Sequence, residues 1–123
     1  MVEPAHLLGA GGALGAILRY AVGRWLAYDR FPVATLVVNV IGSFVLGLVT
    51  FSGVSNQIVL FVGVGACGSF TTYSSFSFKT VRLWETGDRL RATTYAVGTL
   101  SLCLIAAGSG ALLVTRFSGS IAA

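Results

Sequence analysis

The chain is short, rich in apolar residues and poor in charge. It has 123 residues, of which 55% are hydrophobic and 10% are charged, whereas soluble domains carry about 25% charged residues. This composition excludes a soluble catalytic domain, a nucleotide-binding domain and a nucleic-acid module, and it favours a membrane protein that is not an enzyme. The net charge of +4 is then interpreted as a sign of membrane orientation, with no nucleic-acid partner.

Charge-free runs predict an all-α membrane protein with four transmembrane helices. No Asp, Glu, Lys or Arg occurs between Arg30 and Lys79. This run is long enough for two crossings, because one helix needs about 20 apolar residues. The expected helices, in a single domain over residues 1–123, cover about 5–25, 32–52, 58–84 and 92–115. Four short helices make a thin bundle, so we expect at least a dimer.

The first predicted helix contains a charge, Arg19, well inside its length. Gly11, Gly15 and Gly23 share its four-residue spacing and therefore its helical face. Glycines on such a face allow membrane helices to pack closely. A charge at membrane depth is costly unless it faces water or a partner. Arg19 is therefore either a vestibule residue or an arginine that extends to the membrane edge.

The second predicted helix, for which Pro32 is a suitable start, carries polar residues on one face. Thr35, Asn39 and Ser43 recur every four positions. An amide inside a membrane helix needs hydrogen-bonding partners, so Asn39 must face protein or water. Both hydrogen bonding between helices and a polar pathway remain open as interpretations of this face.

The third predicted helix contains a segment that should interrupt it. Six of the nine residues from Ser69 to Ser77 are Ser or Thr, and they follow Gly65 and Gly68. Hydroxyl side chains compete for backbone hydrogen bonds and glycine weakens helices. We therefore predict a break from about Gly68 to Thr72, near the membrane centre. Non-helical backbone is tolerated there only if it is buried in protein or lines a polar cavity.

The fourth predicted helix follows a loop from Glu85 to Arg91 and places Tyr95, Thr99 and Cys103 on one face. No carboxylate lies at membrane depth in this arrangement, because the acidic residues all fall at helix ends or in loops. A proton-coupled exporter of the small four-helix type would usually need such a carboxylate.

The polar groups that do lie at membrane depth suit a small anion. Hydroxyl and amide hydrogens can replace the water around an anion, and aromatic ring edges are electropositive. Tyr73 and Phe76 lie three residues apart and would present their edges from one helical face. Backbone carbonyls released at a helix break would instead suit a hard cation such as sodium. The residues alone do not identify the anion.

Three motifs occur in order along these helices: Gly11–Tyr20 (GGALGAILRY), Thr35–Phe44 (TLVVNVIGSF) and Gly65–Ser77 (GACGSFTTYSSFS). With them, the chain resembles the Fluc family of fluoride channels, also called CrcB-like proteins, over all four helices. The resemblance implies a passive, fluoride-selective channel that exports cytoplasmic fluoride. It also implies an antiparallel dimer with two pores and a structural sodium ion at the dimer centre.

The resemblance assigns roles to individual residues. Backbone carbonyls of Gly68 and Thr71 from both subunits would hold the sodium ion. The fluoride pathway would comprise Asn39, Ser43, Tyr73, Ser74, Phe76, Tyr95 and Thr99. Arg19 and Lys79 would lie in the vestibule.

Three residues depart from the family pattern. Tyr73 replaces the first of two phenylalanines, Ser69 replaces the second glycine of a pair, and Lys79 stands where a glutamate is common at the pore mouth. These departures leave two questions open: whether both pores conduct alike, and whether Tyr73 acts as a ring edge or as a hydrogen-bond donor.

Basic residues are concentrated on one side of the predicted topology. Four crossings place both termini on one side, with Arg116, and place six basic residues on the other: Arg24, Arg30, Lys79, Arg82, Arg89 and Arg91. The positive-inside rule then predicts both termini outside the cytoplasm, in a multi-pass protein of the plasma membrane.

This bias bears on assembly, because an antiparallel homodimer needs a chain that inserts both ways. We hypothesise an antiparallel heterodimer with a related, oppositely biased chain, and a dual-topology homodimer is the alternative. Fluoride and membrane lipid are the other expected partners. Besides a channel, a proton-coupled exporter and a non-conducting assembly subunit are the competing functions.

Overall fold

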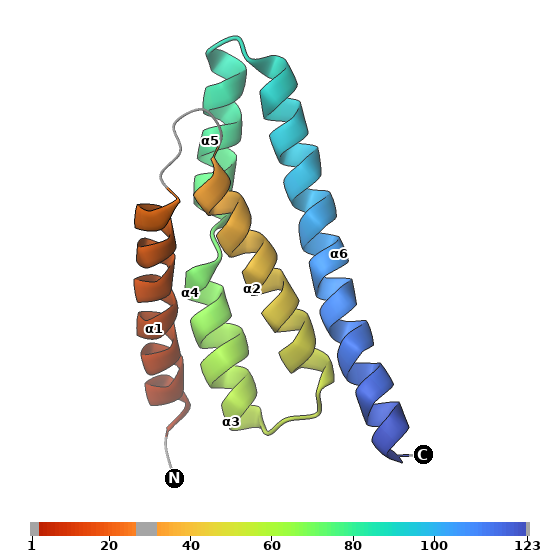
Figure 1. The fold of residues 1–123 in the computed structure, drawn as a ribbon. Coiled ribbons are helices and arrows are strands. Elements are labelled where there is room, and N and C mark those ends of the chain that lie inside the picture. The colour runs from red at the N-terminus through yellow and green to blue at the C-terminus, as the bar shows by residue number, and fades with distance from the viewer. Residues whose placement is uncertain (1–2, 27–31, 123) are drawn as a thin grey trace.

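The computed structural model describes residues 3–26 and 32–122, with side chains up to residue 117. The regular elements of this part of the chain are all helical (Figure 1). Four segments within it are long and apolar enough to cross a membrane: Pro4–Trp25, Val33–Phe51, Asn56–Glu85 and Arg89–Phe117. The prediction of an all-α chain with four such helices is confirmed.

The first two helices begin and end within a residue of their predicted bounds. Helix α1 covers Pro4–Trp25 and helix α2 covers Val33–Phe51. Pro32 precedes the first helical residue of α2, and its carbonyl accepts a hydrogen bond from the backbone N–H of Leu36 at 3.2 Å. Residues 27–31, between these two helices, lie outside the described residues.

The third membrane segment consists of four helical pieces in series. They are α3 (Asn56–Ile58), the π-helical η1 (Val59–Cys67), α4 (Gly68–Phe70) and α5 (Tyr73–Glu85). Between α4 and α5 the backbone is extended, with ψ 162° at Thr71 and φ −152°, ψ 115° at Thr72. Gly68, at the start of the predicted break, is still helical, so the extended backbone is limited to two residues. The nine-residue π-helical stretch was not predicted.

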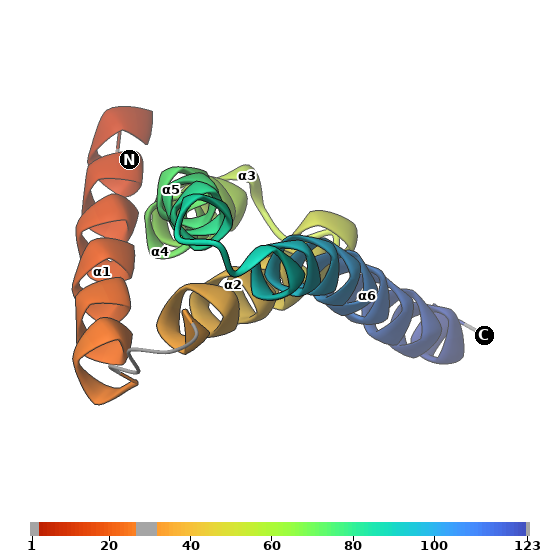
Figure 2. The ribbon, with the colours of Figure 1, turned by 90° about the horizontal axis from the view of Figure 1, so that it is seen from above.

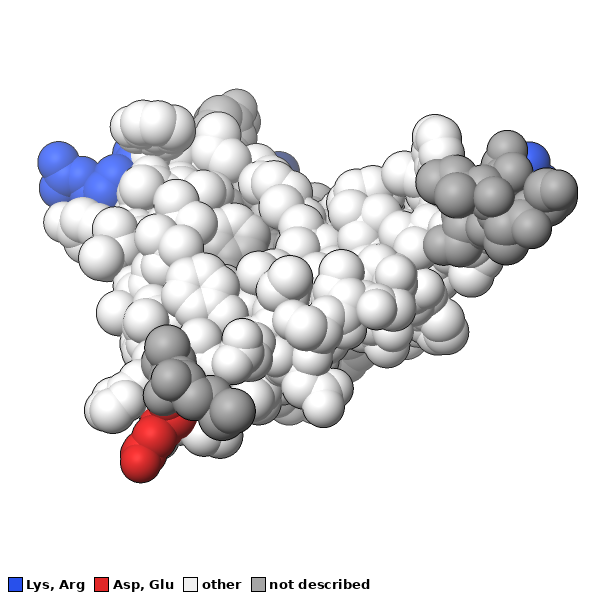
Figure 3. Space-filling model, turned by 90° about the horizontal axis from the view of Figure 1, so that it is seen from below, with Lys and Arg blue, Asp and Glu red and all other residues white. Residues whose placement is uncertain are grey.

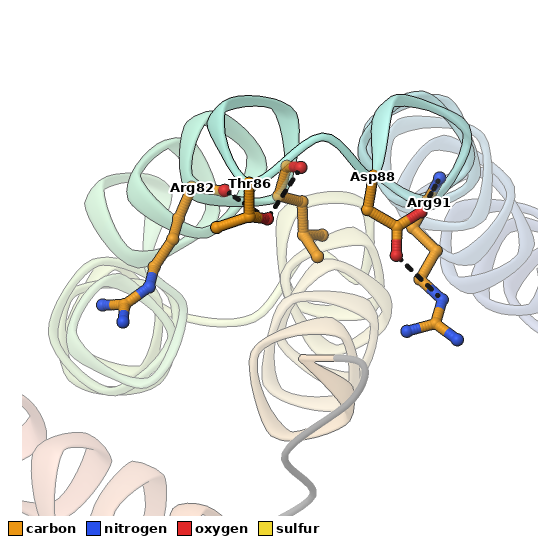
Figure 4. Close-up of polar contacts among 5 residues, drawn as sticks. Arg82, Thr86, Asp88 and Arg91 are labelled. Carbon is orange, nitrogen blue, oxygen red and sulfur yellow. Dashed lines mark hydrogen bonds and ion pairs between the residues drawn. The ribbon is translucent and has the colours of Figure 1, made fainter.

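The predicted loop from Glu85 to Arg91 is wrong, because only residues 86–88 separate α5 from α6 (Figure 4). The Thr86 hydroxyl donates to the carbonyls of Arg82 and Leu83 at 3.0 and 3.1 Å, which satisfies the end of α5. Gly87 supplies the positive φ of 90° that closes the turn.

Helix α6 covers Arg89–Ala122 and is therefore longer at both ends than the predicted 92–115. Asp88 explains its early start. The backbone N–H of Arg91 donates to Asp88 Oδ1 at 3.4 Å, and Arg91 Nε lies 3.4 Å from Asp88 Oδ2 (Figure 4). An aspartate in this position stabilises the first turn of a helix even when arginines follow it. Charge alone was therefore a poor guide to this helix boundary.

The helices pack in a row rather than around a closed core (Figure 2). Helix α1 packs on η1 and α4, whereas α6 packs on α2 and α5. At the first of these contacts, Gly11 and Gly15 face the backbone of Phe61 and Ala66 so closely that a Cβ would collide with it. The predicted glycine seam is therefore present at these two positions, but nothing lies within 4 Å of a Cβ placed at Gly23.

The two termini lie at the same end of the bundle, as four crossings require (Figure 1). Viewed from this end, the surface is almost entirely uncharged, with charged side chains only at its edges (Figure 3). The turn between α5 and α6, with Arg82, Arg89 and Arg91 near it, lies at the opposite end. The bundle therefore has a basic end and a nearly neutral end.

The close contact between α2 and α6 gives a prediction about stability. A Cβ on the buried Gly110 would lie 2.5 Å from the Phe44 carbonyl oxygen and 3.0 Å from the Leu48 nitrogen, whereas nothing lies within 4 Å of a Cβ on Gly108. We expect Gly110→Ala to lower the free energy of unfolding by about 1–3 kcal/mol. Gly108→Ala on the same helix is the matched control and should leave it nearly unchanged. Thermal unfolding in detergent measures both, and equal midpoints would contradict this packing.

Candidate functional site

A groove of about 860 Å³ lies among α2, η1, α5 and α6 and crosses the extended residues Thr71 and Thr72. No residue of α1 lines it, and no described residue in its lining is charged. Seven of the residues assigned to the sodium site or the fluoride pathway line it: Asn39, Ser43, Gly68, Thr71, Tyr73, Phe76 and Thr99. Residues from two of the three motifs and from α6 therefore meet in one place.

Asn39 holds the extended backbone at the base of this groove. Its Nδ2 donates to the Thr72 carbonyl at 3.1 Å, and its Oδ1 accepts from the Thr72 backbone N–H at 2.7 Å. Both backbone groups of Thr72 are thereby satisfied away from any helix. A primary amide has two N–H donors, so Asn39 keeps one for a further partner. Hydrogen bonding between elements and a contribution to a polar site are thus compatible roles for one side chain.

The extended backbone at Thr71 and Thr72 interrupts the helix, and two backbone carbonyls lose their usual hydrogen-bond donors as a result. In an uninterrupted α-helix the N–H of Thr72 would donate to Gly68, and the N–H of Ser75 would donate to Thr71. Here the N–H of Thr72 goes to Asn39, and the N–H of Ser75 goes to Thr72 Oγ1 at 3.1 Å. The Gly68 and Thr71 carbonyls therefore lose their helical donors. They are the two carbonyls that the resemblance assigns to a cation.

Aromatic rings form a row that leads away from the groove. The ring centroids of Tyr73 and Phe76 lie 6.1 Å apart, and those of Phe76 and Tyr95 lie 5.3 Å apart, each pair tilted by more than 40°. Tyr73 is 81% exposed and Tyr95 only 1% exposed. Tyr95 is not part of the groove lining but lies behind Phe76. Tilted rings present edges as well as faces to their surroundings.

Thr99 is a buried polar residue in the groove lining. It is 4% exposed, and its Oγ1 has no hydrogen-bond partner among the described residues. Leaving a buried hydroxyl unpaired costs about 1–3 kcal/mol, so such a group in a native structure calls for a partner. A molecule or ion in the groove would supply one.

The remaining candidate residues lie outside the groove. Ser74 is exposed, and its Oγ lies 3.3 Å from Thr72 Oγ1. Lys79 donates from Nζ to Thr35 Oγ1 at 2.6 Å, between α5 and α2. Arg19 is exposed on α1 and is not brought near the groove within one chain. Its two interpretations, as a vestibule residue and as an arginine at the membrane edge, both stay open.

Sequence reasoning missed the central part played by Thr72. Its backbone is the partner of Asn39, and its hydroxyl caps α5 by accepting from Ser75. Threonine is a common N-cap residue, because its hydroxyl accepts from the backbone N–H three positions later. Because Thr71 and Thr72 are adjacent, the sequence did not show which of them is the N-cap of α5. The apolar residues of the lining, such as Leu46 and Val97, carry no signal that separates them from lipid-facing residues.

Four segments are able to cross a membrane, and amide, hydroxyl and aromatic groups meet in an uncharged groove between them. These features define a multi-pass membrane protein with a candidate site between its helices. The family model described as CrcB-like protein, Camphor Resistance (CrcB), matches residues 6–111. The chain belongs to this family, which confirms the resemblance noted in its motifs.

Several relatives are similar along nearly their whole length. The fluoride-specific ion channel FluC 2 of Haloarcula marismortui is 55% identical over 107 residues, which cover 87% of this chain and 90% of the relative. FluC 1 of Halobacterium salinarum is 45% identical over 100 residues, covering 81% and 84%. FluC of Thermus thermophilus is 42% identical over 116 residues, covering 89% and 91%.

Proposed function

We propose that this chain forms a fluoride-selective ion channel, or one subunit of such a channel, through which cytoplasmic fluoride leaves the cell passively. The relatives named as fluoride-specific ion channels support this proposal. The observation that carries it is the uncharged groove in which Asn39, Thr99 and Phe76 meet the helix interruption. Its lining offers donors and ring edges to an anion but no carboxylate to bind a proton.

Fluoride chemistry explains why such a lining is suitable. The ion is small and strongly hydrated, so a pore must replace its water with closely spaced donors. The spare N–H of Asn39, the Thr99 hydroxyl and the edges of Phe76 and Tyr73 are donors of this kind. None carries a full charge, so each binds fluoride weakly enough to release it. Conduction requires this balance between binding and release.

A structural sodium ion at the Gly68 and Thr71 carbonyls is part of the proposal. The released carbonyls support it, since hard cations are bound by unwound backbone in membrane proteins. We place the interruption near the membrane centre, with the same carbonyls of a second subunit completing the site. Sodium would then hold the two interruptions together and would not itself be transported.

Sodium binding predicts a change in stability. Replacing sodium by N-methylglucamine at equal ionic strength should lower the thermal midpoint. The loss corresponds to about 2.7 kcal/mol if sodium was present at 100 times its dissociation constant. Differential scanning fluorimetry in detergent measures the shift, and choline is the matched control for a bulky cation. Identical midpoints in sodium, N-methylglucamine and choline would contradict a structural sodium site.

We propose that the groove is completed by a second subunit in antiparallel orientation. The groove is open on one side, and Tyr73 at its edge is 81% exposed. The basic end of the bundle would face the cytoplasm of a plasma-membrane protein, with both termini outside. Because this charge bias favours one orientation, a related chain of opposite bias is the proposed partner. A purified, fluoride-conducting dimer of this chain alone would instead establish the dual-topology homodimer.

The function is tested in liposomes loaded with fluoride and chloride. A potassium ionophore is added, and ion-selective electrodes record the release of each anion. Rapid loss of fluoride with chloride retained supports the channel. Release that requires an imposed pH gradient would indicate a proton-coupled exporter instead. Retention of fluoride by vesicles that contain this chain both alone and with a co-expressed homologous chain would contradict the proposal.

A further inference from the structure

Lys79 is the only lysine of the chain and lies on α5, one turn beyond Phe76. Its Nζ donates to Oγ1 of the buried Thr35, which lies on α2 one turn before Asn39. Two polar links therefore join α2 to the third membrane segment: Asn39 to Thr72 and Thr35 to Lys79. In sequence, Phe76 lies between Thr72 and Lys79, the two residues that these links join to α2.

The charge of Lys79 is not neutralised within the described part of the chain. No carboxylate there forms an ion pair with it, and the hydrogen bond to Thr35 joins it to a neutral hydroxyl. An ammonium group has three donors, and one of them is used here. The side chain is half-buried, where its field is screened less than at an open surface.

An anion can replace the Thr35 hydroxyl as the hydrogen-bond acceptor of Lys79. An anion adds the attraction between opposite charges to its hydrogen bond with the ammonium, which the neutral Thr35 hydroxyl does not supply. The Thr35 side chain is in turn a neighbour of the Tyr95 hydroxyl, and the Tyr95 ring contacts Phe76. An anion at Lys79 would therefore lie next to the hydroxyls and rings that lead into the groove.

We propose that Lys79 is an anion-capture residue at the mouth of the fluoride pathway, which exchanges the Thr35 hydroxyl for the permeating ion. The inference rests on the proposed function and adds to it the residue that first binds the ion. A fixed positive charge at a narrow mouth raises the local concentration of anions and their rate of arrival. When the anion leaves, the Lys79 ammonium can form its hydrogen bond to the Thr35 hydroxyl again, which favours release of the anion into the pathway.

The first test measures anion binding without transport. Because the chain has a single lysine, an amine-selective reagent modifies only Lys79 and the N-terminal amine, and the latter is an internal control. Fluoride should slow modification of Lys79 by about threefold or more relative to chloride at equal ionic strength. In Thr35→Val, the lysine should react faster without fluoride and still be protected by it. Equal modification in fluoride and chloride would overturn the proposal.

The second test measures transport in liposomes. Lys79→Met should lower the fluoride efflux rate by about threefold to tenfold at low ionic strength, and an impermeant salt should reduce this difference because it screens the charge. Lys79→Arg should retain most of the wild-type rate. Arg82→Met, one turn further along α5 and exposed, is the matched control and should change the rate little.

The two tests separate this inference from the proposed function. Vesicles that release no fluoride with the wild-type chain, both alone and with a co-expressed homologous chain, would contradict the channel, while the modification experiment would still decide whether Lys79 binds the anion. Fluoride release by Lys79→Met at the wild-type rate, with the same dependence on salt, would overturn the role of Lys79 and leave the channel intact.

Discussion

Replacing Asn39 with leucine is expected to abolish fluoride efflux and to lower the free energy of unfolding by about 2–5 kcal/mol. Leucine has a similar volume but cannot pair with the N–H and C=O of Thr72, which Asn39 satisfies at 2.7 and 3.1 Å. Each buried backbone group left without a partner costs about 1–3 kcal/mol. Thermal unfolding and fluoride-electrode recordings measure the two effects.

Ser43→Ala is the control for the Asn39 variant. Ser43 lies one turn further on the same face of α2 and lines the groove. It forms no hydrogen bond with Thr72, whose backbone groups both pair with Asn39. Its removal should therefore leave the free energy of unfolding within about 0.5 kcal/mol of the wild-type value. If Asn39→Leu were as stable as Ser43→Ala, the extended backbone would not depend on the asparagine.

Replacing Phe76 with leucine is expected to lower the fluoride rate by tenfold or more while the protein stays folded. The Phe76 ring lies between those of Tyr73 and Tyr95, and leucine offers an anion no electropositive edge. A barrier raised by about 1.4 kcal/mol reduces a rate tenfold. The stability cost of this apolar exchange should stay below about 1.5 kcal/mol. Efflux from liposomes at matched protein density measures the rate.

Phe78→Leu is the matched control for this ring. Phe78 lies two residues further on α5, is exposed, and is absent from the groove lining. Its replacement should leave fluoride efflux unchanged. A similar loss of rate in both variants would mean that the Phe76 ring supports the bundle rather than the ion.

The membrane helices could be predicted because each depends on its own composition. The apolar composition of α1 and α2 gave their bounds to within a residue, although α1 contains Arg19. The polar face of α2 was also visible, because Thr35, Asn39 and Ser43 repeat every four residues. These features are local, so no knowledge of the neighbouring helices was needed.

The position of the extended backbone could be predicted only approximately. Glycines and hydroxyl residues marked a region from Gly68 to Thr72, but the choice of Thr71 and Thr72 depends on Asn39, which is 33 residues from Thr72 in sequence. A contact of this separation has no local signature. The π-helical stretch Val59–Cys67 likewise has a composition like that of any apolar membrane helix.

The candidate site was predicted mainly from residue chemistry and the family motifs. Asn39, Phe76 and Thr99 line one groove, although the spacing within each helix could not show that these helices face one another. The link between Lys79 and Thr35 was not predicted. Lysine side chains are long and flexible, so their partners are determined by the packing of neighbouring helices.

The reversal potential in a planar bilayer tests the central claim most directly. The protein is incorporated with fluoride at different concentrations on the two sides, and chloride and proton gradients are then imposed separately. For a passive fluoride channel, the potential at zero current follows the fluoride gradient and does not move with chloride or pH. A reversal potential that follows the chloride or the proton gradient would contradict a fluoride-selective channel.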